Sequence, residues 1–256
     1  MSREPVSAAR LRDAHSSVPP RAHGSRLVVS SIGTELLDDP ATDPALVRRM
    51  LADIARCNRW LGGTAAVRYG LARLLDASDR GREFTLFDIG TGAADLPRAA
   101  QRWARHRGIS LAPLGLERIP AAAAVAQSCG VPVILGCAGA LPLRDGSVDI
   151  VLVSQVAHHL DHDSAVRLFA ECSRIARRGV IVADLHRRWF AAPGFRAAGR
   201  LLGVHAMTID DGVTSLRRGY SLDEMRALCV AADVKNVNVA ARLGARVVAT
   251  WRTDER

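Results

Sequence analysis

The chain has 256 residues, a hydrophobic content of 48% and a formal net charge of +9. This length suits one α/β domain with an attached element, or two small domains, and the apolar fraction supports a sizeable core. The positive charge raises the question of nucleic-acid binding, but aromatic residues make up only 4% of the chain. The basic residues are dispersed, and nearly all are arginine because Lys235 is the only lysine. Composition therefore disfavours a nucleic-acid partner.

No segment has the pattern of a membrane span or of a secretory signal. The longest uncharged stretch, residues 120–143, is interrupted by prolines and glycines, and the N-terminus lacks the apolar core of a signal peptide. The five cysteines form neither a CxxC pair nor a zinc-binding spacing. This pattern predicts buried thiols in a reducing cytoplasm, and it predicts no metal site.

The first 80 residues contain two predicted units. Residues 1–34 lack aromatic residues and a sustained period, which predicts a flexible tail. Residues 35–80 are predicted to form an N-terminal helical cap. Its first helix begins at Pro44 with Asp43 as the N-cap, and the pair Gly62–Gly63 separates it from a second helix over residues 64–77.

Residues 81–256 show an alternation of strands and helices. It predicts parallel βαβ units with helices on both faces of the sheet. Residues 186–220 are too long for a plain connection, so we expect a helix and a loop that form a lid. The predicted strands are 84–89, 111–117, 131–135, 148–154 and 179–185, with helices at 94–106, 119–128 and 163–177. A capping box at Ser221 then starts another helix, and two strands flank Leu243–Gly244.

The turn after the first predicted strand, in the stretch LFDIGTGAADLP, is typical of a ligand site. Gly90 and Gly92 allow a ligand to approach the backbone closely, and Asp88 can accept a hydrogen bond directly or through water. A nicotinamide dinucleotide fold is the rival interpretation, but a pyrophosphate would avoid Asp88 and Asp95. Glu117, at the end of the second strand, is placed to accept hydrogen bonds from both hydroxyls of a ribose.

In order and spacing, residues 81–185 resemble the class I S-adenosylmethionine-dependent methyltransferases. The matching pieces are FDIGTGAADLP, LGLERIP, GCAGALPLRDGSVDIVLVSQVAHHL and VIVADL. The fragment ALPLRDGSVDIV is the most specific, because it resembles the ubiquinone/menaquinone-type enzymes and bacterial natural-product O-methyltransferases. The resemblance implies an α/β, Rossmann-like sheet of seven mostly parallel strands with a reversed last strand, and it implies S-adenosylmethionine as the cofactor and S-adenosylhomocysteine as its product.

The resemblance also implies a set of cofactor contacts. The glycine turn would flank the methionine part, Glu117 would hold the ribose, and Arg118 would lie by the adenine. Cys137 departs from the family, which often has an aspartate there, although the backbone N–H of Ala138 remains available to the adenine ring. The full predicted set is Asp88, Gly90, Thr91, Gly92, Glu117, Arg118, Cys137, Ala138, Ser154 and Arg59.

A histidine and an aspartate are candidates for proton removal from a hydroxyl acceptor. His158 and His159 follow the fourth strand, and Asp184 ends the fifth, which is its neighbour in this fold. An aspartate beside a histidine fixes its tautomer and stabilises the imidazolium, so His158 with Asp184 is the first candidate for the base. His159 is the second candidate. The alternative is structural, with the histidines shaping a loop and Asp184 capping a helix.

The acceptor is predicted to be a small molecule, aromatic or polyketide-like, that is methylated on a hydroxyl. Trp60, His205, Met207 and Arg218 are the candidate acceptor contacts. N- or C-methylation and a non-methylating, S-adenosylmethionine-binding catalyst remain alternatives. An RNA methyltransferase is disfavoured because no NPPY-type motif is present. We further expect a cytoplasmic monomer or homodimer.

Overall fold

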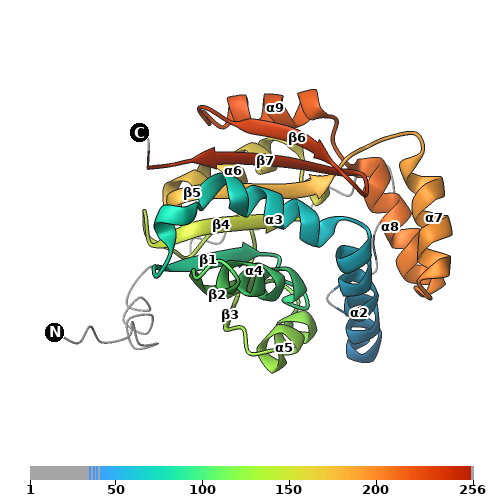
Figure 1. Cartoon of the computed structure of the whole chain (residues 1–256). Coiled ribbons are helices and arrows are strands. Elements are labelled where there is room, and N and C mark those ends of the chain that lie inside the picture. The colour runs from blue at the N-terminus through green and yellow to red at the C-terminus, as the bar shows by residue number, and fades with distance from the viewer. Residues whose placement is uncertain (1–34, 36, 38, 40, 255–256) are drawn as a thin grey trace.

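A computed structural model describes residues 35, 37, 39 and 41–254, and the predicted tail lies outside this range. The strands form one seven-stranded sheet in the order β3-β2-β1-β4-β5-β7-β6 (Figure 1). The sheet is parallel from β3 to β5, and β7 runs antiparallel to both β5 and β6. The predicted sheet with a reversed last strand is thereby confirmed. The strands are β1 (Glu83–Ile89), β2 (Ser110–Glu117), β3 (Val133–Leu135), β4 (Val148–Ser154), β5 (Ala176–Leu185), β6 (Asn238–Arg242) and β7 (Arg246–Arg252).

Helices cover both faces of the sheet because the central strands are apolar on both sides. In β4, Ile150 and Leu152 pack into one core, whereas Val151 and Val153 pack into the other. The first core includes side chains of α3 and α4, and the second includes side chains of α6 and α9. The helices of this part are α3 (Gly63–Leu74), α4 (Asp95–Arg105), α5 (Pro120–Ser128), α6 (His162–Ile175) and α9 (Leu222–Ala231).

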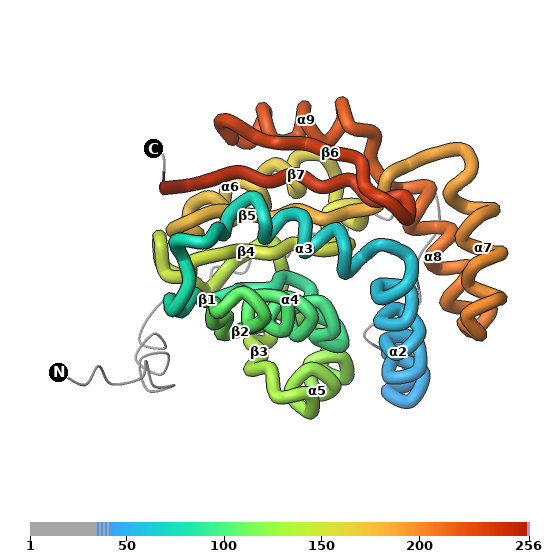
Figure 2. The backbone as a smooth tube through the Cα atoms, in the orientation of Figure 1, coloured from blue at the N-terminus to red at the C-terminus, as the bar shows by residue number. Residues whose placement is uncertain are grey.

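The first helix of the cap, α2 (Pro44–Trp60), begins and ends where the sequence predicts. The side chain of Asp43 accepts a hydrogen bond from the backbone N–H of Ala45 at 2.7 Å, and Pro44 occupies the first turn. At the other end, Gly62 adopts a left-handed conformation with φ of 88°, which turns the chain into α3. Helix α2 lies at one end of the sheet rather than on a face of it (Figure 2).

The predicted lid differs from the structure in one respect. Residues 186–220 contain two helices, α7 (Ala191–Leu201) and α8 (Ala206–Arg218), where the sequence predicted one helix and a polar loop. The segment of α8 is helical because Ile209, Val213 and Leu216 recur on one buried face. The buried carboxylate of Asp53 also accepts hydrogen bonds from the N–H of His205 and the hydroxyl of Thr208, at 2.9 and 3.3 Å.

These helices meet at the end of the sheet where the parallel strands finish. Figure 1 shows α2, α7 and α8 gathered there, beyond the carboxyl ends of β4 and β5. Among the helices in the described part of the chain, none combines the length and the apolar character that crossing a membrane requires.

Candidate active site

A cavity of about 1130 Å³ opens at the carboxyl ends of the parallel strands. Its walls come from the loops after β1, β2 and β4, from α2, and from the lid helices. Ligands of open α/β sheets bind in this position, because the strand ends and the following loops leave a crevice there. The volume is that of a site for one or two small organic molecules.

The glycine turn after β1 forms one wall of this cavity. Gly90 and Gly92 have φ of 73° and 51°, so both backbone conformations favour glycine. A Cβ atom on Gly90 would lie 2.5 Å from a side-chain carbon of Val156. Side chains larger than hydrogen therefore do not fit at Gly90, because Val156 packs against it, and both glycines line the cavity.

Glu117 stands opposite this turn with its carboxylate fixed by backbone donors. Oε2 accepts a hydrogen bond from the N–H of Gly92 at 2.9 Å. Oε1 accepts from Arg118 and Ile119 at 2.8 and 3.0 Å. Three of the roughly four acceptor positions of a carboxylate are thus occupied, and the remaining one is on Oε2. The arrangement suits one hydroxyl hydrogen bond better than the predicted two.

Two further carboxyl groups make this wall acidic. Burial, reinforced by the charges of Asp95 and Glu117, raises the pKa of Asp88 to about 8. Burial also raises the pKa of Asp95, although a hydrogen bond from Asn58 opposes that change. The side chain of Asn58 donates to Asp95 at 3.1 Å and accepts from Gln155 at 2.9 Å. Asn58 therefore ties α2 to the start of α4 and to the loop after β4.

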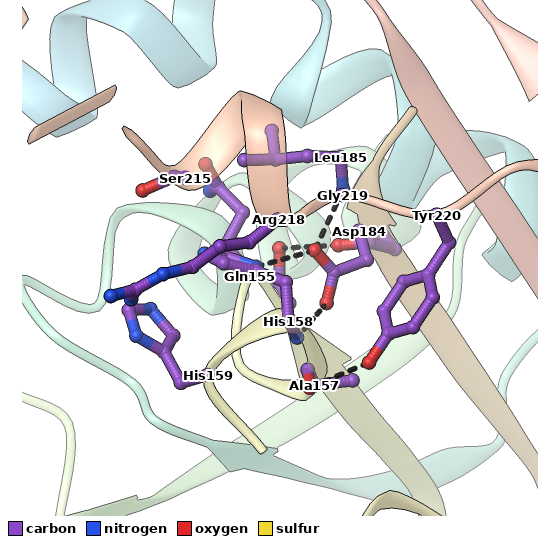
Figure 3. A network of polar contacts seen from close by, with 12 residues as sticks. Gln155, Ala157, His158, His159, Asp184, Leu185, Ser215, Arg218, Gly219 and Tyr220 are labelled. Carbon is purple, nitrogen blue, oxygen red and sulfur yellow. Dashed lines mark hydrogen bonds and ion pairs between the residues drawn. The ribbon is translucent and has the colours of Figure 1, made fainter. Parts of the chain in front are cut away.

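His158 and Asp184 meet at the ends of β4 and β5, as the sequence predicts (Figure 3). Nδ1 of His158 lies 2.7 Å from Oδ1 of Asp184, and both side chains are buried. Nε2 of His158 is buried and has no hydrogen-bond partner within the described part of the chain. Since Asp184 engages Nδ1, the geometry favours the tautomer in which Nε2 carries the lone pair.

The surroundings hold this pair in one position. Burial by itself would raise the pKa of Asp184, but the adjacent His158 and the backbone N–H of Leu185 hold that pKa below its usual range. The hydroxyl of Tyr220 donates to the carbonyl oxygen of Ala157 at 2.7 Å, one residue before His158 (Figure 3). Gln155 has φ of 56°, a strained conformation for a residue other than glycine, which marks the same loop as constrained.

His159 faces a different set of partners. Its ring lies 4.2 Å from that of His158, and its Nε2 is 3.9 Å from Oε2 of Glu35. Ligand atoms of Glu35, His158 and His159 all lie within 4.8 Å of one another, so the three residues are able to hold a metal ion. Arg218 donates to Oε1 of Glu35 at 3.1 Å and supplies positive charge at that carboxylate. The absence of a metal stays a prediction.

Most of the predicted cofactor residues line the cavity, and the predicted acceptor contacts do not. Arg59 and Trp60 are exposed, and the Arg59 guanidinium stacks on the Trp60 ring at 5.1 Å, outside the cavity wall. His205, Met207 and Arg218 are likewise absent from the wall. The predicted residues that line the cavity are Asp88, Gly90, Thr91, Gly92, Glu117, Arg118, Cys137, Ala138, Ser154, His158 and His159.

Several residues of the cavity wall were not predicted from the sequence. Thr208 and Ser215 of α8 line it, because that segment is a helix and turns other residues inward than a loop would. Asn58, Gln155 and Arg246 also belong to the wall. Arg246 begins β7, far along the chain from any motif, and its only sequence signal is a charged residue at the start of an apolar strand.

Comparisons with known proteins agree with this geometry. Residues 87–183 match a family described as a methyltransferase domain. A S-adenosylmethionine-dependent methyltransferase from Aquifex aeolicus is 16% identical with a TM-score of 0.53, covering 82% of this chain and 97% of that one. A Thermotoga maritima S-adenosylmethionine-dependent methyltransferase, described as a possible histamine N-methyltransferase, is 20% identical with a TM-score of 0.52, covering 80% and 99%.

A third similar structure is an O-methyltransferase family 2 protein from Planctomyces limnophilus in complex with apigenin. It is 18% identical with a TM-score of 0.57, and the match covers 83% of this chain and 62% of that one. No curated protein matches the chain. At these identities the structural likeness concerns the fold, and the domain match adds the chemistry. Residues 87–183 thus form a methyltransferase domain, in a chain whose fold is that of S-adenosylmethionine-dependent methyltransferases.

Proposed function

We propose that the protein transfers the methyl group of S-adenosylmethionine to a hydroxyl of a small acceptor, aromatic or polyketide-like, with His158 as the base. The observation that carries this proposal is the buried contact of 2.7 Å between His158 and Asp184. Nε2 is then the ring nitrogen without a hydrogen-bond partner in the described part of the chain, and His158 lines the same cavity as the cofactor wall. A base is needed by an alcohol or phenol and not by an acceptor that is already ionised.

The residues of the cofactor wall fit S-adenosylmethionine. The backbone of Gly90 and Gly92 lines the cavity and suits the methionine part, and an ammonium group bound beside Asp88 would favour the ionised form of that carboxyl. Oε2 of Glu117 is the acceptor for a ribose hydroxyl, and Arg118, Cys137 and Ala138 border the adenine position. When bound, the cofactor supplies an electrophilic methyl group on a sulfonium sulfur.

The proposed mechanism uses His158 to remove one proton. Asp184 keeps the proton of His158 on Nδ1, so the lone pair of Nε2 points at the acceptor. As the acceptor oxygen attacks the methyl carbon, its O–H proton passes to Nε2, and the carboxylate of Asp184 stabilises the imidazolium that forms. Alignment of oxygen, methyl carbon and sulfur in one line is the task of the cavity walls.

The test is a double-mutant series on purified protein with a panel of phenolic and aliphatic hydroxyl acceptors. We expect His158→Ala to lower kcat by roughly 10²–10⁴-fold while the affinity for S-adenosylhomocysteine stays unchanged. Asp184→Asn should lower kcat too, and the double variant should lose less than the product of the single losses, because the two residues act together.

The same series distinguishes the alternatives. If His159→Ala is inactive and His158→Ala is not, the base is His159. If both variants keep normal turnover, the acceptor is a nitrogen, a carbon or an ionised oxygen, and the O-methylation proposal is wrong. Formation of no S-adenosylhomocysteine with any acceptor, despite binding of the cofactor, would favour a non-methylating role.

The setting in the cell is part of the proposal. All five cysteines are free thiols, which suits a reducing compartment such as the cytoplasm. We propose a monomer or homodimer that acts on a small molecule without a nucleic-acid partner, and sedimentation of the purified protein would measure its oligomeric state.

A further inference from the structure

Arg246 is a buried cation in the cavity wall that the proposed methyl transfer does not use. It is the first residue of β7 and pairs in register with Leu185, the residue after Asp184. This pairing places Arg246 at the carboxyl end of β5, on the same side of the cavity as the base. Its exposed fraction is 5%, and it lines the cavity.

The guanidinium of Arg246 has no partner in the described part of the chain. It makes neither a hydrogen bond nor an ion pair there, and its Nε is fully buried without an acceptor. An arginine side chain carries five N–H donors, and leaving them unsatisfied in a buried position is unfavourable. Other arginines with little exposure are paired, such as Arg178 with Asp79 at 2.7 Å and Arg218 with Glu35 at 3.1 Å.

The acids that influence Arg246 are engaged by other donors and form no hydrogen bond or ion pair with it in the described part of the chain. Burial lowers the pKa of Arg246, and the charges of Asp184, Cys57 and Asp95 oppose that change. Yet Oδ1 of Asp184 is engaged by His158 and Leu185. The carboxylate of Asp95 accepts a hydrogen bond from Asn58. Neither Asp184 nor Asp95 therefore binds the guanidinium of Arg246.

We propose that Arg246 binds a carboxylate of the acceptor, so that the substrate is a small hydroxylated acid. A guanidinium forms two parallel hydrogen bonds with a carboxylate, which fixes both the position and the plane of that group. His158 follows β4 and Arg246 begins β7, the two strands that flank β5, so such an anchor would hold the acceptor while its hydroxyl faces Nε2. This inference rests on the proposed function, because it takes the bound acid to be the methyl acceptor. Binding of a carboxylate by Arg246 does not itself require methyl transfer.

The experiment measures binding rather than turnover. Protein saturated with S-adenosylhomocysteine is titrated with hydroxylated aromatic acids, namely 2-, 3- and 4-hydroxybenzoate and 4-hydroxycinnamate, and with their neutral carboxamides. We expect at least one acid to bind the wild type more tightly than its amide. Arg246→Gln should weaken that acid on the order of 10- to 100-fold and leave the amide unchanged, because only the charged hydrogen bonds are lost. Arg246→Lys should retain part of the preference.

Matched variants make the result specific. Arg73→Gln removes an exposed arginine from the last turn of α3 and should change neither affinity. His158→Gln should keep the preference for the acid, so a failure of the proposed base leaves this result standing. Thermal unfolding of Arg246→Gln checks that the variant is folded.

Two results would overturn the proposal. The first is that no acid binds the wild type better than its amide. The second concerns the cofactor, whose methionine part also carries a carboxylate. If Arg246→Gln weakens S-adenosylhomocysteine but not 5′-methylthioadenosine, which lacks the amino-acid group, Arg246 holds the cofactor and not the acceptor.

Discussion

At the scale of single residues, the candidate site depends on how tightly His158 is held. Its ring is fixed by Asp184, and its backbone N–H lies 3.4 Å from the same carboxylate. The carbonyl oxygen of the preceding residue is held by the Tyr220 hydroxyl. A base that must meet a hydroxyl within a few tenths of an ångström benefits from such support, because misplacement costs rate even when binding is unaffected.

We predict that Tyr220→Phe lowers kcat by roughly 3- to 30-fold and leaves the affinity for S-adenosylhomocysteine unchanged. The lost hydroxyl leaves the carbonyl oxygen of Ala157 with the N–H of Leu160 as its remaining donor, at a cost of about 0.5–1.5 kcal/mol, and loosens the loop that carries His158. Steady-state kinetics and calorimetry measure the two effects separately.

Tyr69→Phe is the matched control for Tyr220→Phe. The hydroxyl of Tyr69, in α3, donates to the side chain of Asn238, in β6, at 2.9 Å, and neither residue lines the cavity. The Tyr69→Phe variant should be less stable than the wild type but should have the same kcat. Equal losses of kcat in the two variants would show that the effect of Tyr220 is general destabilisation and not positioning.

At the scale of elements, α2 is a wall of the site and not an independent cap. Met50, Leu51 and Asn58 line the cavity, and Leu51 lies within 3.3 Å of the Cβ position of Gly92. Asp53 on the same helix caps the start of α8. One helix thus contacts the glycine turn, the loop after β4 and the lid.

We therefore predict that deletion of residues 1–63 abolishes methyl transfer. The loss removes one wall of the cavity and leaves Asp95 and Gln155 without the amide of Asn58. Deletion of residues 1–30 is the control and should leave activity nearly intact, because that segment has no core-forming pattern. Turnover and affinity for S-adenosylhomocysteine are measured for both. Full activity of the longer deletion would show that α2 is dispensable.

At the scale of the whole molecule, the buried acid Asp88 links stability to pH. Its pKa is about 8 in the folded protein and about 3.9 in an unfolded chain. Between these values the folded state holds a proton that the unfolded state has released, so the free energy of unfolding falls as the pH rises. The stability that this proton gives the folded state is fully present below about pH 4 and is lost by about pH 8.

We predict that the ligand-free protein loses up to about 1.4 kcal/mol of stability per pH unit between pH 5 and pH 8 from this residue. Asp88→Asn cannot ionise, so its profile should be flatter over the same range. Urea unfolding at pH 5, 6.5 and 8 measures both profiles. Parallel profiles of the two proteins would mean that Asp88 is ionised when folded.

Two turns that lie far apart in the sequence are joined by close backbone contacts. The turn between α2 and α3 packs against the hairpin between β6 and β7, where a Cβ on Gly244 would lie 2.0 Å from the carbonyl oxygen of Leu61. A Cβ on Gly62 would lie 2.1 Å from the carbonyl oxygen of Leu243. The cap is thereby anchored to the reversed strand that carries Arg246.

We predict that Gly244→Ala lowers the free energy of unfolding by roughly 3 kcal/mol or more, because it adds a backbone clash to the penalty for a positive φ. Gly130→Ala is the matched control, since Gly130 has φ of 81° and no atom within 4 Å of its Cβ position. It should cost only about 1–2 kcal/mol. Chemical denaturation measures both, and equal costs would mean that the hairpin moves aside without loss.

Much of this protein was predictable from the sequence alone, because the information is local. Strand β4 and the helix caps at Asp43 and Ser221 appear where the sequence predicts them, since alternation, capping and glycine turns act over a few residues. The dyad of His158 and Asp184 was predictable as well. In a parallel sheet, the carboxyl ends of neighbouring strands meet at the same edge.

Only the tertiary structure decided which residues of the cap and the lid reach the cavity. Trp60 follows an apolar helix but is exposed, whereas Asn58, two residues earlier, is buried and bridges three elements. Residues 186–220 were predicted as one helix and a loop, but the segment of α8 is a second helix, because Asp53 accepts a hydrogen bond at its start and Ile209 and Val213 are buried. Arg246 becomes a site residue only through the antiparallel pairing of β7 with β5. Such contacts join residues that lie 37 to 152 positions apart, and the pattern around any one of them does not contain its partner.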